Sequence, residues 1–184
     1  MAVSLAGKLL VASRNLSDSH FSRTVVFLLH HDEEGAFGLV INRRSSVRLS
    51  DIWDRVGEGS CPLDLPVMVG GPVEGPLVVM HTEATLGEME VAPGVHFTAQ
   101  SDHLASLLQQ AGEPIKVVIA SSGWSGGQLE HELAEGSWDV ADATQELIFG
   151  DDETLWQQLT RRLADQWLVE RLGIRQVPNQ PWHN

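Results

Sequence analysis

A serine flanked by glycines offers the clearest pattern for covalent chemistry. Residues 123–127 read Gly-Trp-Ser-Gly-Gly and match the G-x-S-x-G nucleophile elbow, with an expected strand before the turn and an expected helix after it. A histidine could activate Ser125, and the first amides of the helix could stabilise an oxyanion. No aspartate and histidine follow in a context that completes a triad, since His183 lies near the end of the chain. A tight glycine turn is the simpler explanation, and a serine hydrolase is kept as an alternative.

Histidines and carboxylates form a second group of candidates. Residues 30–33 read His-His-Asp-Glu, while His81 with Glu83 and His131 with Glu132 lie elsewhere. Neutral imidazole and carboxylate ligands suit zinc or manganese. However, His131-Glu132 lacks the second histidine of H-E-x-x-H, and adjacent residues on a strand point to opposite faces. We therefore assign no metal site and no cofactor, with a metal-dependent enzyme as a further alternative.

Glycines near polar side chains point to a ligand site. A helix that starts at Gly126-Gly127 would offer free amides to a carboxylate or phosphate, and the pair Gly70-Gly71 would let the backbone approach a ligand closely. The predicted ligand-binding residues are Asn42, Arg43, Gly70, Gly71, His81, Trp124, Gly127 and Gln128. Each also has a structural explanation, because glycines form turns and buried polar side chains satisfy backbone groups. We expect Trp124 and Trp138 to be buried in the core, as tryptophan usually is.

Charge and composition exclude several classes of partner. The 184 residues include 25 acidic and 12 basic ones, a formal net charge of −13, which disfavours direct binding to nucleic acid. The single cysteine, Cys61, excludes an intramolecular disulfide. No apolar run approaches the roughly 20 residues of a membrane span, and the run near the N-terminus is too short for a signal peptide. We expect a cytoplasmic protein that binds neither nucleic acid nor membrane, and the sequence leaves its oligomeric state open.

Hydrophobic patterns predict the elements that position these residues. Strands are expected at residues 7–12, 24–29, 36–41, 67–69, 77–81, 95–99, 115–120 and 146–149. Helices are expected after Ser50 as N-cap, at 101–111, from Gly126-Gly127 to Gly136, and from 151 onwards. The second and third strands should form an antiparallel hairpin. In the last helix a buried stripe is predicted by the four-residue spacing of Leu155, Leu159, Leu163 and Trp167.

Four blocks of sequence occur in a characteristic order. They are residues 10–12 with 18–26, residues 34–43, residues 70–73 with 80–82, and residues 123–124 with 127–132 and Trp138. The ordered set resembles the AlgH/YqgE family, the uncharacterised UPF0301/DUF179 proteins. The resemblance implies a mixed, largely antiparallel sheet, partly rolled into a barrel-like shape and flanked by helices. It also implies a regulatory role, because the AlgH name came from regulation of alginate synthesis.

The sequence departs from the family pattern at two places. Ala120-Ser121-Ser122 stands where the family often has a Gly-Tyr pattern, and Arg44 stands where a proline frequently follows Asn-Arg. Any role of that tyrosine therefore does not carry over to this chain.

Together these observations predict an α+β protein with one domain over residues 1–173 and an extended C-terminal tail over 174–184. Its predicted function is that of a non-enzymatic ligand- or protein-binding module with an indirect regulatory role. The partner would be an unknown protein or a small anionic ligand.

Overall fold

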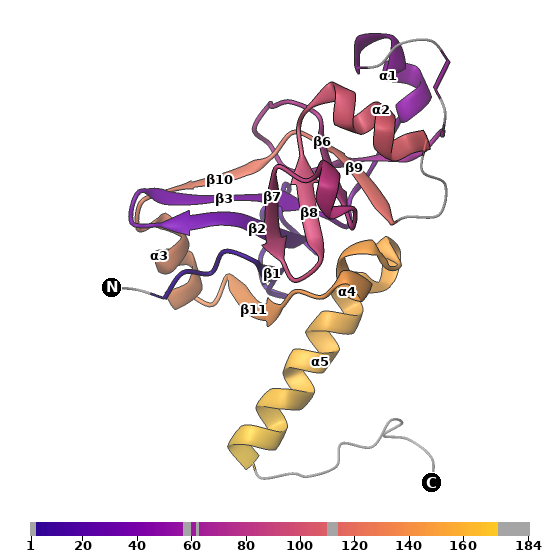
Figure 1. Ribbon diagram of the computed structural model, residues 1–184. Coiled ribbons are helices and arrows are strands. Elements are labelled where there is room, and N and C mark those ends of the chain that lie inside the picture. Colours follow the sequence, from indigo (N-terminus) through magenta and orange to yellow (C-terminus); the bar gives the residue numbers. More distant parts are fainter. Residues whose placement is uncertain (1–2, 57–59, 62, 110–113, 173–184) are drawn as a thin grey trace, which may run out of the picture.

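Two β-sheets stack face to face in the computed structural model, which describes residues 3–56, 60–61, 63–109 and 114–172 (Figure 1). Sheet A is antiparallel and has the strand order β10-β3-β2-β1-β11. Its strands are β1 (Lys8–Ala12), β2 (Val25–Asp32), β3 (Gly35–Val40), β10 (Ser122–Ser125) and β11 (Trp138–Asp142). The predicted hairpin is confirmed, because β2 pairs with β3 in antiparallel register.

Sheet B is mixed and has the strand order β4-β5-β9-β6-β8-β7, with β5 and β9 parallel. Its strands are β4 (Arg44–Arg48), β5 (Pro66–Val69), β6 (Val78–His81), β7 (Met89–Ala92), β8 (Val95–Thr98) and β9 (Ile115–Ile119). The predicted α+β class with largely antiparallel pairing is confirmed. The barrel-like shape is not: over the described residues each sheet stays open and ends in strands with one neighbour, β10 and β11 in sheet A and β4 and β7 in sheet B.

Helices pack on the outer faces of both sheets and against the cluster between the sheets. They are α1 (Leu49–Val56), α2 (Ser101–Gln109), α3 (Gln128–Ala134), α4 (Gln145–Phe149), α5 (Asp152–Leu172) and the short 3₁₀ helix η1 (Ala84–Leu86). On sheet B, Trp53 of α1 and Leu107 of α2 join one hydrophobic cluster. On sheet A, Leu129 of α3 packs against Trp124 and Trp138. The third cluster fills the space between the sheets and includes Phe27, Met68, Met80, Val118 and Leu155.

Two local predictions were wrong. Residues 146–149 form part of α4 rather than a strand, and the Thr144 hydroxyl accepts a hydrogen bond from the Leu147 amide at 3.3 Å as the helix N-cap. A short apolar run occurs in strands and in helices alike, and here the Thr144 cap favours the helix. Ser50 lies inside α1, which begins one residue earlier at Leu49. Strands β4, β7, β10 and β11 were missed because their residues are largely polar or exposed.

A buried ion cluster joins the first turn of α5 to sheet B. The Lys116 ammonium of β9 donates to Asp152 Oδ1 at 2.5 Å and to the Ile41 carbonyl at 3.0 Å. Both charged side chains are only 8% exposed, and Arg44 Nε donates to the other Asp152 oxygen at 3.0 Å. Burial lowers the pKa of Lys116, and Asp152 opposes that shift. Arg44, which departs from the family pattern, thus anchors the helix.

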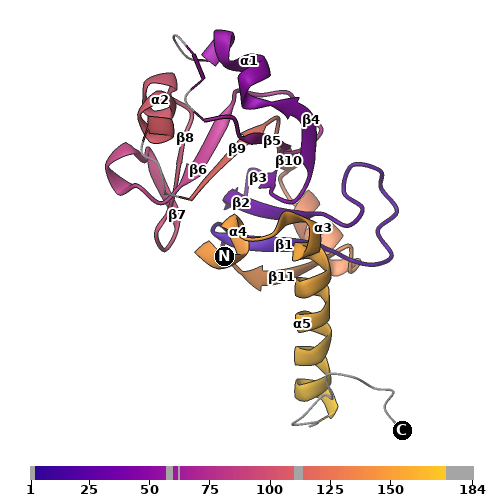
Figure 2. The same cartoon turned by 90° about the vertical axis from the view of Figure 1, so that its right-hand side faces the viewer.

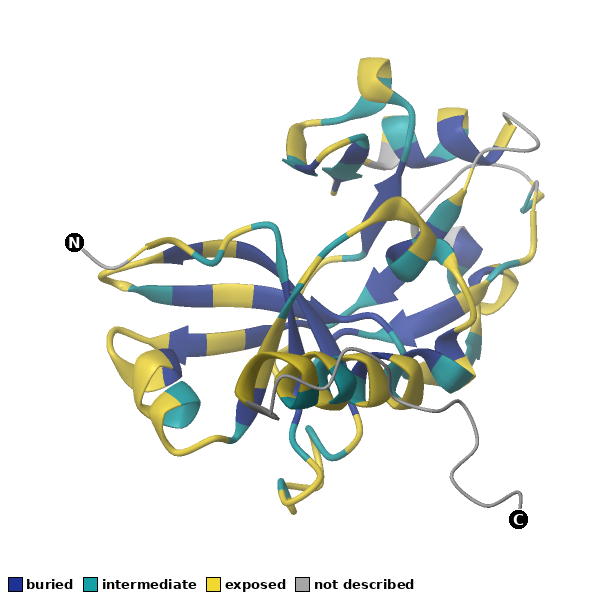
Figure 3. Ribbon diagram, turned by 90° about the horizontal axis from the view of Figure 1, so that it is seen from below, coloured by how far each residue is buried: buried dark blue, intermediate teal, exposed yellow. Residues whose placement is uncertain are grey.

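Beyond this anchor, α5 leaves the body of the protein (Figure 2). Leu155 and Leu159 are buried, Leu163 is half-buried, and Trp167 is 55% exposed. The predicted buried stripe is therefore wrong at its last position. The helix is 21 residues long, about 30 Å, and its second half extends away from the sheets (Figure 2). Most of the residues along α5 are exposed or half-buried (Figure 3).

Removing the Asp152 charge should destabilise the fold, because Asp152→Asn leaves the Lys116 ammonium buried without its carboxylate. We expect the free energy of unfolding in urea to fall by about 3 kcal/mol. Glu153→Gln is the matched control, since Glu153 is 78% exposed and lies 3.8 Å from Arg44, and it should change stability little. Adding Lys116→Met to Asp152→Asn should restore much of the loss. Equal effects of the two single variants would contradict this account.

Candidate functional site

The predicted site residues lie in three separate places rather than in one pocket. The first is the turn from β10 into α3. Ser125 donates hydrogen bonds from its amide and its hydroxyl to Gln128 Oε1, each at 3.1 Å. Gln128 Nε2 in turn donates to Glu132 Oε1 at 2.9 Å. The Ser125 hydroxyl is therefore oriented by an amide, which cannot act as the general base of a hydrolase.

Glu132 is the centre of this first place, although its sequence context suggested only a metal ligand. Its Oε2 accepts hydrogen bonds from the indole nitrogens of Trp124 at 2.9 Å and Trp138 at 2.8 Å. Phe21 stacks on Trp124 with ring centroids 5.9 Å apart and meets the edge of Trp138 at 5.4 Å. Both tryptophans are buried, as predicted. The signal in the sequence was the pair of tryptophans on either side of an acidic helix.

The second place is the corner where the chain passes from one sheet to the other. Asn42 Oδ1 accepts from the Val25 amide at 2.8 Å, and its Nδ2 donates to the Arg23 carbonyl at 3.0 Å. The Arg43 guanidinium donates to the His20 carbonyl at 2.6 Å and to the Ser22 carbonyl at 3.4 Å. These two side chains hold the segment that precedes β2. Their polar groups are engaged by the protein itself.

Gly70 and Gly71 lie at the same corner, against the crossing from β9 to β10. A Cβ atom on Gly70 would stand 2.4 Å from the Ala120 carbonyl oxygen, and one on Gly71 would stand 2.2 Å from that of Ser121. Ser122 Oγ donates to the Gly70 carbonyl at 2.9 Å. Close packing of backbones therefore requires both glycines. Gly127 serves α3 instead, as an N-cap residue with φ of 76°.

The third place is a histidine pair on the outer face of sheet B. His81 of β6 lies opposite His96 of β8, and the rings stack with centroids 6.0 Å apart. His81 is fully buried, and neither of its ring nitrogens has a hydrogen-bond partner among the described residues. Burial, and then the neighbouring His96, lower the pKa of His81, while the Glu83 backbone and carboxylate oppose the shift and His103 adds to it.

Three of the histidines considered as metal ligands each contact a different carboxylate. His30 pairs with Asp32 at 2.8 Å, and His31 pairs with Glu130 of α3 at 2.9 Å. His131 lies 3.4 Å from Glu135. Over the described residues, no three His, Cys, Asp or Glu side chains come together as a metal site would require. These contacts give the metal-dependent alternative no support.

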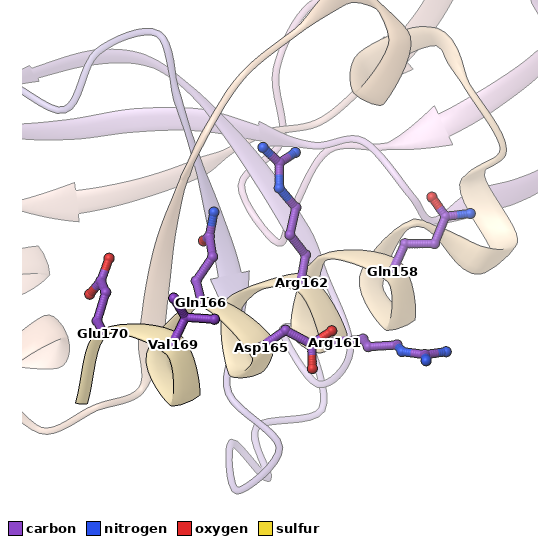
Figure 4. A pocket seen from close by; sticks show the side chains of 7 residues that line it. All are labelled: Gln158, Arg161, Arg162, Asp165, Gln166, Val169 and Glu170. Carbon is purple, nitrogen blue, oxygen red and sulfur yellow. The ribbon is translucent and has the colours of Figure 1, made fainter. Parts of the chain in front are cut away.

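Two hollows border α5, away from all predicted site residues. One cavity of about 600 Å³ is lined by seven side chains of α5 alone, and Figure 4 shows them along one flank of the helix. A second cavity of about 600 Å³ lies between α5 and β11, where its lining includes Val140, Leu163, Trp167 and Leu168. The second combines two elements and apolar side chains, which favours it as a contact site. The sequence did not predict this groove, because the regular spacing of Trp167 indicated a buried side chain.

Comparison with known proteins identifies the family. The family model described as AlgH-like (DUF179) matches residues 9–168. The chain belongs to the AlgH-like family. A UPF0301 protein from Chlorobaculum tepidum is 36% identical over 168 residues, covering 88% of each chain. A UPF0301 protein from Shewanella frigidimarina is 34% identical over 175 residues, covering 89% of this chain and 94% of its own.

Two solved structures share the fold of this AlgH-like chain. The solution structure of the AlgH protein from Pseudomonas aeruginosa matches with a TM-score of 0.73 and 24% identity, over 98% of each chain. The crystal structure of protein DIP2367 from Corynebacterium diphtheriae also has a TM-score of 0.73, with 20% identity over 88% of each chain. At these identities the likeness establishes the architecture. The described part of the chain contains no helix that is both long and apolar enough to cross a membrane.

Removing the Glu132 carboxylate should loosen the aromatic cluster of this AlgH-like protein. Glu132→Ala leaves the indole N–H groups of Trp124 and Trp138 without their acceptor. We expect a loss of about 1–3 kcal/mol in the free energy of unfolding and upfield shifts of both indole proton resonances. Glu135→Ala, on the exposed side of the turn, is the control and should leave both resonances in place. Unchanged indole resonances in Glu132→Ala would show that this network does not form in solution.

Stability should fall with acid because of His81. Its pKa in the folded state lies below the ordinary 6.5, so the unfolded chain binds the extra proton first. The stabilisation is present above pH 6.5 and is lost as the pH falls below that value, by at most about 1.4 kcal/mol per pH unit. His96→Asn removes the neighbouring imidazole that lowers the pKa of His81 and should reduce this slope, as measured by urea unfolding between pH 7.5 and 5. His131→Asn, on the surface, should keep the wild-type slope.

Proposed function

We propose that this AlgH-like chain is a non-enzymatic protein-binding module with an indirect regulatory role. Its contact surface is the groove between α5 and β11 that contains Val140, Leu163, Trp167 and Leu168, named the α5 docking face. The regulatory part of the proposal follows from the family resemblance. The binding part rests on one observation, a tryptophan that is 55% exposed beside the free edge of a sheet.

The docking face combines an apolar surface with an unpaired strand. Trp167 of α5 is 55% exposed, and Val140 of β11 is 36% exposed. Tryptophan is enriched among the residues that contribute most to protein contacts. β11 has a hydrogen-bonded neighbour on one side, β1, so its other edge can pair with an added strand. Apolar anchors and free backbone groups together favour an extended peptide segment as the occupant.

The charge of the protein indicates which residues a partner segment should contain. The protein has a net charge of −13, and the groove is lined by two carboxylates, Asp139 and Glu170, and one guanidinium, Arg14. A partner segment rich in acidic residues would be repelled, whereas one with basic and apolar residues would be attracted. We therefore infer an extended segment with apolar anchors and few carboxylates.

The alternatives have less support from the geometry. The hydroxyl of Ser125 is bound to Gln128, and the candidate metal ligands are held in separate ion pairs. A small anionic ligand at the predicted residues would have to displace protein contacts, because Asn42 and Arg43 already bind backbone groups. A cytoplasmic location remains part of the proposal.

Charging the docking face should abolish partner capture. Trp167→Glu replaces the exposed indole with a carboxylate and should reduce recovery of a specific partner at least tenfold in quantitative affinity purification. Met89→Glu is the matched control, because Met89 is 48% exposed on β7 of the other sheet and the added charge is the same. Circular dichroism should show both variants folded. If Met89→Glu lost the same partner, or Trp167→Glu kept it, binding would not occur at the α5 docking face.

A further inference from the structure

We propose that the outer face of sheet B carries a second binding site, a small cavity between α1 and α2 that takes a short branched-chain monocarboxylate. The cavity has a volume of about 130 Å³ and shares no described residue with the α5 docking face. The inference therefore goes beyond the proposed function and does not depend on it. Three observations carry it: the position and size of the cavity, its apolar lining, and an arginine that has no partner in the described structure.

The cavity lies where two short helices meet sheet B. α1 has eight residues and α2 has nine, and both stand at the end of the molecule away from α5 (Figure 1). Val79 of β6 and Thr98 of β8, which are paired in antiparallel register, both line the cavity. Leu104 of α2 and Arg55 of α1 line it as well. The site is therefore built on paired strands and on two helices rather than on a single loop.

Apolar side chains form most of the lining. Leu77, Val79 and Leu104 belong to or pack against the hydrophobic cluster that α1 and α2 form with sheet B, and Pro76 and Ala99 also line the cavity. An apolar cavity of about 150 Å³ accepts benzene, so one slightly smaller suits a branched group of about four or five carbon atoms. The apolar part of the ligand is thus limited in size by the lining.

Arg55 is the one charged side chain among the described residues that line the cavity. It is exposed, and it forms no ion pair or hydrogen bond with another described residue, although the chain has 25 acidic residues. A guanidinium presents a fork of donors that matches a carboxylate. A free guanidinium beside an apolar cavity therefore suits a ligand with one charged end and one apolar end.

The other polar groups of this lining are bound by the protein. The Thr98 hydroxyl donates to Glu88 Oε2 at 2.9 Å, and Gln100 Nε2 donates to Glu88 Oε1 at 3.1 Å. The Ala99 amide also donates to Glu88 Oε2, at 2.5 Å. These three donors stabilise the Glu88 carboxylate, so Arg55 is left to bind an anion. A single cation selects a ligand with a single negative charge.

Titration of the full chain with isovalerate (3-methylbutanoate) tests the inference by NMR. The amide resonances of Leu77, Val79 and Leu104 should shift with a Kd of about 1 mM, which is ordinary for a ligand of about seven heavy atoms. Resonances of β11 and α5 should stay in place. Isovaleramide has nearly the same shape without the charge, and it should bind about tenfold more weakly. The ionic strength is kept constant with chloride throughout.

Three variants separate recognition by Arg55 from a general effect of charge. Arg55→Gln should weaken isovalerate binding about tenfold, because it removes the charge-assisted contact. Arg14→Gln is the matched control, since it removes the same charge from an exposed arginine that lines the groove between α5 and β11. Ala99→Leu adds apolar volume to the lining and should abolish binding. Circular dichroism should show all three variants folded.

Two results would overturn the inference. Unchanged resonances in the wild-type chain far above the expected Kd would mean that the cavity takes no such carboxylate. Equal binding by Arg55→Gln and the wild type, or a loss in Arg14→Gln, would place the ligand elsewhere. Trp167→Glu should bind isovalerate as the wild type does, so loss of a partner at the α5 docking face and loss of this ligand are separate outcomes.

Discussion

The chain passes from one sheet to the other at a corner where two backbone segments pack very closely. Only glycine fits at the closest points, Gly70 and Gly71. A Cβ atom on Gly70 or Gly71 would stand within 2.4 Å of a carbonyl oxygen of the β9–β10 crossing. The crossing itself bends through Ala120, whose φ of 60° is unusual for a residue other than glycine. Because β3 also leaves sheet A here to become β4, this single contact fixes the positions of both sheets.

The corner also places the elements that hold α5. Once β4 and β9 are fixed in sheet B, Arg44 and Lys116 can both reach Asp152, and the helix starts at a defined point. Leu155 and Leu159 then enter the space between the sheets. After these two turns Leu163 is half-buried, and Trp167, one turn further along, is 55% exposed. The exposed position of Trp167 is thus a consequence of where the corner places the start of the helix.

Much of the fold could be predicted from sequence, and the failures have physical causes. The continuous apolar run of residues 24–29 and the turn after Asp32 correctly predicted the central hairpin. Leu147-Ile148-Phe149 was misassigned because its helix depends on the Thr144 cap, which periodicity does not detect. Trp167 continues a regular spacing, yet spacing does not indicate where a sheet ends. For the candidate site, the role of Glu132 could not be predicted from the sequence. Its two indole partners lie in β10, the strand before α3, and β11, the strand after it, and only the fold brings them together.

The residues that identify the family and those proposed to bind a partner are largely different. Asn42, Arg43, Gly70 and Gly71 hold the corner, and Trp124, Gln128 and Glu132 hold the turn into α3. Each of these residues makes a hydrogen bond or a close packing contact within the protein. A family resemblance that rests on them therefore predicts the architecture well. The α5 docking face is built from Val140, Leu163, Trp167 and Leu168, none of which belongs to those sequence blocks. Family membership therefore indicates how this chain folds, whereas its partner must be sought from the chemistry of α5.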